Sequence, residues 1–325
     1  MSGAELRRAW VLPLLSVALG ACAGPRANRR PDGLRARGAS EARVWEALGR
    51  GDDEGARKLI DSARGGGGDT ATLALADGAL AFERGEVGRA IASYLAVLEG
   101  AATDESSLAA MAAGRLATLL EEHPGPDTDR RAVEERILAV SPARWSWQAR
   151  YGLANLWDRI ARRRGDPVLL AQVGARAGCI GGFAMARPLG RLPHLDLDAT
   201  PVEGPVRAEA ARGCRVAVPS YEGRAGAQRI LIDVDAPAAG SVDVVIGFRG
   251  EGRLVIDGGP SHAHGGEFAY GPQLSAVRAT WSAGRHRLEL RLATYGGRPE
   301  LTVLVVPAVV PPVPVPALPV PPTAA

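Results

Sequence analysis

The chain has 325 residues, 46% of them hydrophobic, and a formal net charge of +3. This length leaves room for two modest domains. The basic residues are almost all arginine, with Lys58 as the single lysine, and no basic stripe is interleaved with aromatic residues, which argues against a nucleic-acid partner.

The first residues have the pattern of an export signal. Two arginines precede a short apolar stretch that ends in small residues. Because about 20 apolar residues are needed to span a bilayer, this shorter run predicts a secretory signal peptide over residues 1–21. The tetrapeptide "LGAC", which ends at Cys22, resembles the bacterial lipobox. The resemblance implies cleavage before Cys22 and a diacylglycerol on its sulfur, with palmitate as an expected acyl chain; an ordinary signal peptide with an incidental cysteine is the alternative.

A lipidated Cys22 would hold the protein on a membrane, because each buried methylene contributes about 0.8 kcal/mol and several chains act together. We therefore expect the bacterial cell envelope as its location, anchored to the outer membrane on either the periplasmic or the surface face. Residues 22–39, rich in arginine, glycine and proline, are predicted to form a flexible tether. Contact of its arginines with anionic lipid headgroups is the alternative.

Apolar residues at helical spacing predict an α-helical domain over residues 40–174. Two stretches in it, "GDDEGARKLI" from Gly51 and "GEVGRAIASY" from Gly85, start 34 residues apart (85 − 51). At this offset alanines align with alanines, and a larger residue follows each, Ile60 or Tyr94. The pattern resembles the tetratricopeptide repeat, which implies stacked helix pairs. An ordinary helical bundle is the alternative, since the family's bulky early residue is missing and "HPGPDTD" interrupts the next unit.

The end of the helical domain is rich in aromatic residues. Trp147, Tyr151 and Trp157 fall on one stretch with helical spacing. We take them as a candidate face for a protein partner, with core packing as the alternative. No catalytic or metal-binding motif is recognisable in the helical half.

From about residue 176 the period changes from helical to alternating. The segments "RILIDVD", "SVDVVIGF", "HRLELRL" and "LTVLVV" each place apolar side chains on one face. Strands with one wet face, separated by glycine-rich turns, predict an antiparallel β-sandwich over residues 176–307. The expected fold class is thus α+β and multidomain, with an N-terminal helical, tetratricopeptide-like domain followed by the sandwich.

Two short motifs in the strand half carry a resemblance. "RLVIDGG" and the later "WSAGRHRLEL" resemble galactose-binding-like and protective-antigen-like sandwiches, which have a jelly-roll-like form, and the matching positions are Asp257, Gly258, Gly284, His286 and Leu288. The segment "LGRLPHLDLDATP" is similar to the opening of such sandwiches in lipoproteins that also contain tetratricopeptide repeats. The resemblance implies an appended module that either binds carbohydrate or packs on a neighbouring domain.

Two cysteines remain in the exported part, Cys179 and Cys214. Oxidising compartments favour disulfides, so we expect these two to pair. Two separate buried thiols are the alternative.

The histidines give little sign of catalysis or metal binding. His262 and His264 in "SHAHGG" are weak metal candidates, because a zinc site needs three or four ligands and a polar hairpin loop explains them equally well. No nucleophile elbow, phosphate-binding glycine loop or "HExxH" motif occurs. We therefore expect no cofactor, no metal and no enzymatic activity.

The proline-rich residues 308–325 are predicted to be an extended tail, acting as a spacer, as a ligand for an aromatic groove, or as a disordered end. For the whole chain we expect a non-enzymatic scaffold lipoprotein whose helices bind a protein partner. The alternative is a carbohydrate-binding protein of the cell envelope that acts through the sandwich.

Overall fold

The computed structural model describes residues 32–66, 70–101, 106–123, 127–142, 145–211, 213–218, 225–265, 273–296 and 299–308. The predicted signal peptide, Cys22 and the tail beyond residue 308 lie outside the described residues. Among the described helices, none combines the length and the apolar character needed to cross a membrane.

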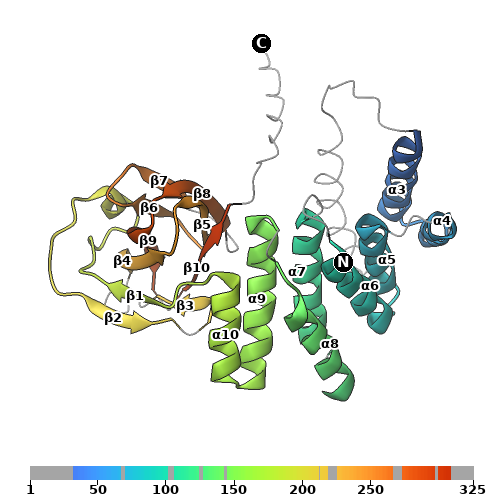
Figure 1. Cartoon of the computed structure of the whole chain (residues 1–325), viewed down its shortest axis with the longest axis horizontal. Coiled ribbons are helices and arrows are strands. Elements are labelled where there is room, and N and C mark those ends of the chain that lie inside the picture. The colour runs from blue at the N-terminus through green and yellow to red at the C-terminus, as the bar shows by residue number, and fades with distance from the viewer. Residues whose placement is uncertain are drawn as a thin grey trace, which may run out of the picture. The chain divides into compact units, whose positions relative to one another are not determined.

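Helices precede strands along the chain (Figure 1). The helices are α3 (Asp32–Arg50), α4 (Asp53–Gly65), α5 (Ala71–Glu83), α6 (Val87–Gly100), α7 (Ser106–Glu122), α8 (Asp127–Ala139), α9 (Trp147–Arg164) and α10 (Pro167–Ala177). The strands are β1 (Gly182–Met185), β2 (Arg207–Ala210), β3 (Arg215–Ala217), β4 (Ala225–Ala236), β5 (Gly240–Phe248), β6 (Gly252–Ile256), β7 (Ser261–His264), β8 (Gln273–Trp281), β9 (Gly284–Tyr295) and β10 (Glu300–Pro307), with a 3₁₀ turn η2 (Leu195–Asp198). The predicted α+β class is confirmed.

The compact units divide at a different place from the change of secondary structure. The first unit ends at Gly100 and the second begins at Ala101, so α7 to α10 belong with the strands. The expected helical domain, residues 40–174, is thus shared between two units. The expected tether is also shorter, because α3 already begins at Asp32, just after Pro31. The alanines, leucine and arginines that follow are good helix formers, which explains this start.

The 34-residue spacing corresponds to a repeated turn in the first unit. Gly51 and Gly85 both have a left-handed backbone, with φ of 73° and 74°. Equivalent hydrogen bonds follow: the N–H of Asp52 donates to Ala47 and that of Glu86 to Ala81. Each turn sets up an antiparallel helix pair, α3 with α4 and α5 with α6.

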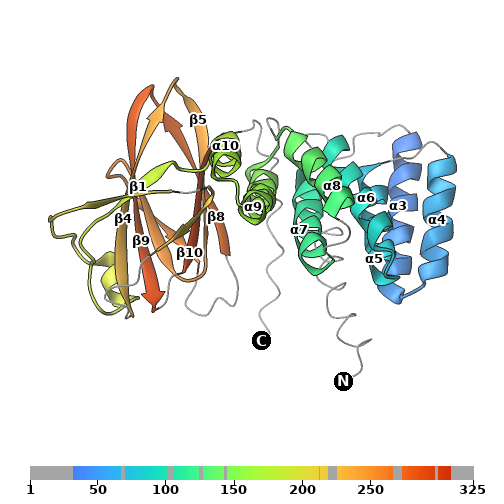
Figure 2. The same cartoon turned by 90° about the horizontal axis from the view of Figure 1, so that it is seen from below.

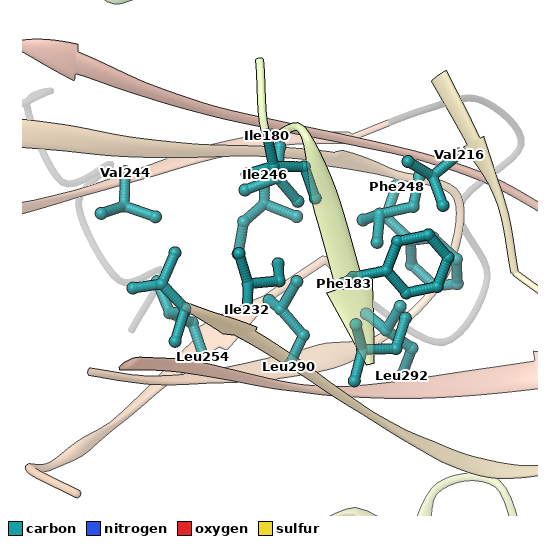
Figure 3. Packing of buried hydrophobic residues seen from close by; sticks show 14 of the residues in the cluster. Ile180, Phe183, Val216, Ile232, Val244, Ile246, Phe248, Leu254, Leu290 and Leu292 are labelled. Atoms are coloured by element: carbon teal, nitrogen blue, oxygen red, sulfur yellow. The ribbon is translucent and has the colours of Figure 1, made fainter. Parts of the chain in front are cut away.

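The strands form two antiparallel sheets that pack face to face in the second unit (Figure 2). One sheet has the order β2-β1-β4-β9-β6-β7 and the other β3-β10-β5-β8. The alternating residues fill the space between them, as Figure 3 shows for Ile232, Ile246, Leu290 and their neighbours. The predicted sandwich and the inward-facing residues of its main strands are confirmed.

One sheet differs from the expectation of a single wet face. On β5 and β10 the outward residues Val245, Leu304 and Val306 are buried as well. Asp243 on the same face is only 4% exposed and forms two hydrogen bonds with Arg278. Helices α9 and α10 lie beside this sheet in both views (Figure 1 and Figure 2). Helices therefore cover this face, and its strands read as continuous apolar runs.

We predict that Gly85→Ala destabilises the first unit by about 1 kcal/mol, because alanine is strained in the left-handed region. Gly88→Ala is the matched control: Gly88 is in α6, and a Cβ there would meet no atom within 4 Å. Its stability should stay equal or rise slightly, since alanine is the better helix former. Urea unfolding followed by helical circular dichroism measures both, and equal stability of the two variants would contradict the assigned turn.

Candidate functional site

The structure joins Cys179 and Cys214 in a disulfide, the pair expected from the sequence. Their Cα atoms are 5.1 Å apart and the residues are 35 positions apart in sequence. Cys179 follows α10 and Cys214 precedes β3, so the bond links the last helix to the edge of the four-stranded sheet. Closing a loop of this length contributes about 3 to 4 kcal/mol in the chain-entropy account.

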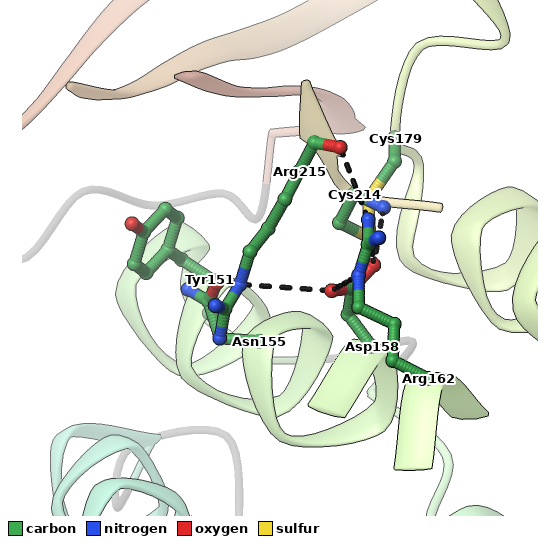
Figure 4. Close-up of a disulfide and its surroundings, with 7 residues drawn as sticks. All are labelled: Tyr151, Asn155, Asp158, Arg162, Cys179, Cys214 and Arg215. Carbon is green, nitrogen blue, oxygen red and sulfur yellow. Dashed lines mark hydrogen bonds and ion pairs between the residues drawn. A yellow bond between two sulfur atoms is a disulfide. The ribbon is translucent and has the colours of Figure 1, made fainter. Parts of the chain in front are cut away.

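A buried carboxylate lies beside the disulfide (Figure 4). Asp158 of α9 has no exposed surface, and its oxygens accept hydrogen bonds from the Cys214 N–H at 2.8 Å and from Arg162 Nε at 2.7 Å. Arg215 Nε lies 3.6 Å away. Arg162 also donates to the carbonyl of Arg215 at 3.1 Å. These contacts fix α9 against β3, because removing any donor would leave a buried charge poorly compensated.

Gly213 makes this approach possible. A Cβ on it would lie 2.3 Å from Asp158 Oδ1, and its φ of +77° also favours glycine. Next to it in space, Gly174 of α10 packs on the Gly213 backbone. The close contact between α9, α10 and the segment before β3 thus depends on two glycines that no sequence motif marks.

The aromatic residues expected to bind a partner mostly face their own chain. Trp157 is fully buried, its Nε1 donates to the carbonyl of Ile137 at 2.8 Å, and Arg176 stacks on its ring at 4.4 Å. Tyr151 packs on Gly247 of β5, where a Cβ would lie 2.3 Å from the phenol oxygen. Trp147 is half-buried at the start of α9. Trp157 is therefore a packing residue and not part of an exposed face, whereas a partner face at Trp147 and Tyr151 stays a prediction.

A cleft of about 340 Å³ opens between α7, α9 and the four-stranded sheet. We call it the α9 cleft. Small residues make room for it, among them Gly114, Gly152 and Gly247. Polar side chains line it, namely Thr118, Tyr151, Asn155, Arg159, Arg215, Glu300 and Thr302. This volume is at the small end of the range for ligand sites.

Several hydrogen-bonding groups in the α9 cleft are only partly used. Asn155 Nδ2 donates to the carbonyl of Tyr151 at 3.1 Å, and among the bonds of the described residues its own carbonyl oxygen accepts none. The Thr118 hydroxyl donates to Gly114 and keeps its lone pairs as acceptors. Figure 4 shows the Arg215 guanidinium beside Asn155. Donors and acceptors therefore meet in one small space.

The charges in the α9 cleft are balanced by neighbouring groups. Arg215 is 3.3 Å from Glu300 and also close to Asp158. Arg159 pairs with Glu121. No cation among these lining residues is left to attract an anion on its own, so the chemistry favours a neutral ligand that both donates and accepts hydrogen bonds.

The two weak metal candidates, His262 and His264, lie in different environments. His264 is 2% exposed, with Nδ1 2.6 Å from the Ser275 hydroxyl and Nε2 3.3 Å from the carbonyl of Phe248. Burial lowers the pKa of His264, and the contact with Phe248 opposes this only in part. His262 is half-buried on β7. In the described part of the chain, no group of three or more histidine, cysteine or acidic residues is arranged to hold a metal.

The two motifs that carry the sandwich resemblance meet in space. Asp257 and Gly258 form the turn after β6, both with positive φ, of 50° and 70°. His286 Nδ1 lies 2.7 Å from Asp257, and its other nitrogen is 2.9 Å from the carbonyl of Ser282. The imidazole also stacks on Trp281 at 4.5 Å. The contact between Asp257 and His286 thus joins the end of β6 to β9 and has a structural role.

A second aromatic group is exposed on the sandwich. Tyr295 is 56% exposed, and its ring is tilted against His194 with centroids 5.4 Å apart. His194 Nδ1 is 2.6 Å from Glu251. Exposed aromatic rings beside polar groups can bind sugars by stacking. This cluster is therefore a second candidate sugar site, against which the α9 cleft can be tested.

Sequence reasoning missed Asn155, Arg215 and the glycines of the cleft. Asn155 lies one helical turn after Tyr151 and therefore on the same face, which was a usable signal. Arg215 and Gly247 are brought to α9 only by tertiary packing, and no local pattern marks them.

Comparisons with known proteins give partial likenesses. No protein family and no curated protein matches the chain. A β-glucosidase from Kluyveromyces marxianus in complex with glucose matches at a TM-score of 0.28 and 11% identity over 39% of this chain, and this match spans only 15% of the β-glucosidase. CBM35 from Cellvibrio japonicus Abf62 matches at 0.23 and 20% identity, over 38% of this chain and 88% of that module. A family 35 carbohydrate-binding module from Clostridium thermocellum matches at 0.21 and 14%, over 40% and 90%.

We predict a pH-dependent contribution from the His286–Asp257 pair. The hydrogen bond with Asp257, followed by the contact with Ser282, raises the pKa of His286. Partial burial favours neutral Asp257, but the Arg287 N–H and His286 outweigh it and lower the pKa of Asp257. A raised histidine pKa stabilises the fold below the unfolded value of about 6.5, and this contribution is lost as the pH rises through the folded value. The lowered pKa of Asp257 stabilises above about pH 3.9 and is lost as the pH falls through its folded value.

The measurement compares the unfolding free energy of the natural chain with that of His286→Gln at several pH values. The difference should be larger at about pH 5.5 than at about pH 9. Asp257→Asn is the control, since asparagine keeps the positive φ of the turn but removes the partner charge. The unfolding free energy of Asp257→Asn should lack the pH-dependent contribution that His286→Gln also lacks. If the difference in unfolding free energy from the natural chain is independent of pH for both variants, the pairing is contradicted.

Proposed function

We propose that this chain binds a neutral saccharide in the α9 cleft without transforming it. The observation that carries the proposal is the convergence of Tyr151, Asn155 and Arg215 in a small cleft whose walls are fixed by the disulfide and by Asp158. A sugar hydroxyl both donates and accepts, which matches an amide, a phenol, threonine hydroxyls and an ion-paired guanidinium. The lack of an unbalanced charge favours a neutral sugar over an acidic one.

The lining of the cleft supports binding without hydrolysis. Glu300 is the one carboxylate among the described lining residues, and it is paired with Arg215. Glycoside hydrolysis normally uses two carboxylates on either side of the bond. The scaffold for a protein partner that was expected first gains no support from the aromatic residues of α9, since Trp157 is buried and Tyr151 packs on β5.

The test separates binding from folding. A Cβ on Gly114 would enter open space, so Gly114→Leu should fold at least as well as the natural chain, because leucine is the better helix former, and should fill the cleft. We expect it to abolish capture of neutral glycans on a glycan array. Gly88→Leu, at an equally open position of α6, is the matched control and should keep the binding.

Two further variants locate the site. Asn155→Ala should weaken binding of the captured glycan about tenfold in calorimetry, the effect of losing one good hydrogen bond. Tyr295→Ala should leave it unchanged. Binding that survives Gly114→Leu but is lost in Tyr295→Ala would place the site on the exposed ring and contradict the cleft, and capture of no glycan would contradict the function.

We also propose that Cys22 carries the lipid that anchors the protein to the bacterial outer membrane. The support is the "LGAC" tetrapeptide after a short apolar run. In a bacterial host, the natural chain should incorporate a labelled fatty acid and sediment with membranes. Cys22→Ser should lose both, with Cys214→Ser as a control that keeps the label, and persistent labelling of Cys22→Ser would refute the anchor.

A further inference from the structure

An exposed apolar patch lies on the loop of residues 189–199, which contains η2. Leu192 is 56% exposed and Leu195 is 77% exposed, the highest value for a large apolar side chain in the described part of the chain. His194, between them in sequence, contacts the exposed ring of Tyr295. We call Leu192, Leu195 and Tyr295 the loop patch. Single exposed apolar residues are common, but several that gather in one place indicate an interaction surface.

The loop that carries the patch is held firmly on the six-stranded sheet. η2 packs on β4 and β9, and Leu197 is fully buried there against Ala227 and Ala293. The Asp196 carboxylate accepts a hydrogen bond from the Leu192 N–H at 2.7 Å, and the Asp196 N–H donates to the Leu192 carbonyl at 2.9 Å. The leucines are therefore exposed on a backbone that is already ordered, so covering them costs little conformational entropy.

Two arginines beside the patch have no internal partner. Arg191 directly precedes Leu192, and Arg249 lines a hollow of about 350 Å³ together with Tyr295. Both arginines are exposed. Among the described residues, neither has a hydrogen bond or an ion pair with its side chain. These two charges are thus free to attract an anionic partner.

The acidic residues near the patch are already paired. Asp198 lies 3.3 Å from Arg253, and Glu251 lies 2.9 Å from the same guanidinium and 2.6 Å from His194. The negative charges of the loop are therefore compensated within the fold, whereas the positive charges of Arg191 and Arg249 are not.

Exposed leucines, an exposed tyrosine and unpaired arginines together match the surface of a lipid bilayer. Leucine side chains gain free energy at the boundary of the acyl chains, tyrosine is enriched at the level of the headgroups, and arginine binds anionic lipid phosphates. We infer that the loop patch binds the surface of an anionic phospholipid membrane, with Leu192 and Leu195 inserted among the headgroups. The unpaired arginines favour this partner, because their charge is complementary to that of the lipid.

The inference depends neither on saccharide binding nor on a lipid at Cys22. None of the patch residues lines the α9 cleft. The test uses residues 23–325, which lack Cys22 and keep every residue that the structure describes. Capture of glycans by the same variants should equal that of the natural chain, so failure of one proposal is distinguishable from failure of the other.

The first arm of the experiment removes the leucines. The chain should sediment with vesicles of phosphatidylethanolamine and phosphatidylglycerol, and Leu192→Ser combined with Leu195→Ser should lower its partition coefficient about tenfold, because apolar surface is lost from the contact. Both positions are exposed, so thermal stability should not change. Val168→Ser, at a 63% exposed position of α10, is the control and should keep the binding. Equal binding of the double variant, or no binding of the natural sequence, would overturn the proposal.

The second arm removes the charges. Arg191→Gln and Arg249→Gln should each lower binding to the anionic vesicles about fivefold, the effect of one arginine near such a surface. Neither substitution should change the weaker binding to vesicles of phosphatidylcholine. An equal loss on both kinds of vesicle would contradict the role of charge.

The third arm locates the contact. Because Cys179 and Cys214 are paired, Leu195→Cys adds a single free thiol to this chain, which can carry an environment-sensitive fluorophore. Its emission should shift to shorter wavelength on the anionic vesicles, whereas the same label at Val168→Cys should not shift. Light scattering without lipid tests the other occupant: a dimer that the double leucine variant loses would show that a second copy covers the patch and would overturn membrane binding.

Discussion

A carboxylate without access to water needs donors around it, and in the second unit the burial of Asp158 imposes this requirement on three parts of the chain. α9 carries the carboxylate and Arg162, β3 supplies Arg215, and Cys214 of the disulfide supplies its backbone N–H. The desolvation cost of such a charge is offset only when its partners are correctly placed. Helix, strand and disulfide must therefore adopt their positions together.

The α9 cleft is a by-product of this arrangement. Arg215 reaches across from the sheet because Asp158 holds it, and Tyr151 packs closely on β5 because Gly247 has no side chain. Binding groups are most effective when other contacts already fix their rotamers. The same residues thus serve the fold and the proposed site.

What could be read from the sequence was mostly local. Alternation placed Ile232 and Leu290 in the core, and the 34-residue spacing predicted helix pairs, whose turns lie at Gly51 and Gly85. The Asp-Gly turn and His286 are matching positions of one family resemblance, and in the fold His286 lies 2.7 Å from Asp257. These features depend on neighbouring residues or on a short period, so a linear pattern records them.

The features that the sequence did not predict depend on contacts between segments far apart in the chain. The aromatic residues of α9 looked available because a helical pattern does not say what covers it, and the covering sheet comes later in the chain. The cleft likewise needs Arg215 from β3 and Glu300 from β10 beside Asn155 of α9. Only the folded arrangement brings these residues together.

The sheet with two buried faces has a consequence for the order of folding. Tyr151 is synthesised 96 residues (247 − 151) before the glycine on which it packs. Contacts over such separations form slowly, because a long loop must close before they stabilise the chain. Until β5 arrives, the side of α9 that carries Tyr151 lacks the strand on which it packs. A chain cut between α10 and β1 would leave both pieces in that state permanently, so the second unit should be produced and studied as one piece.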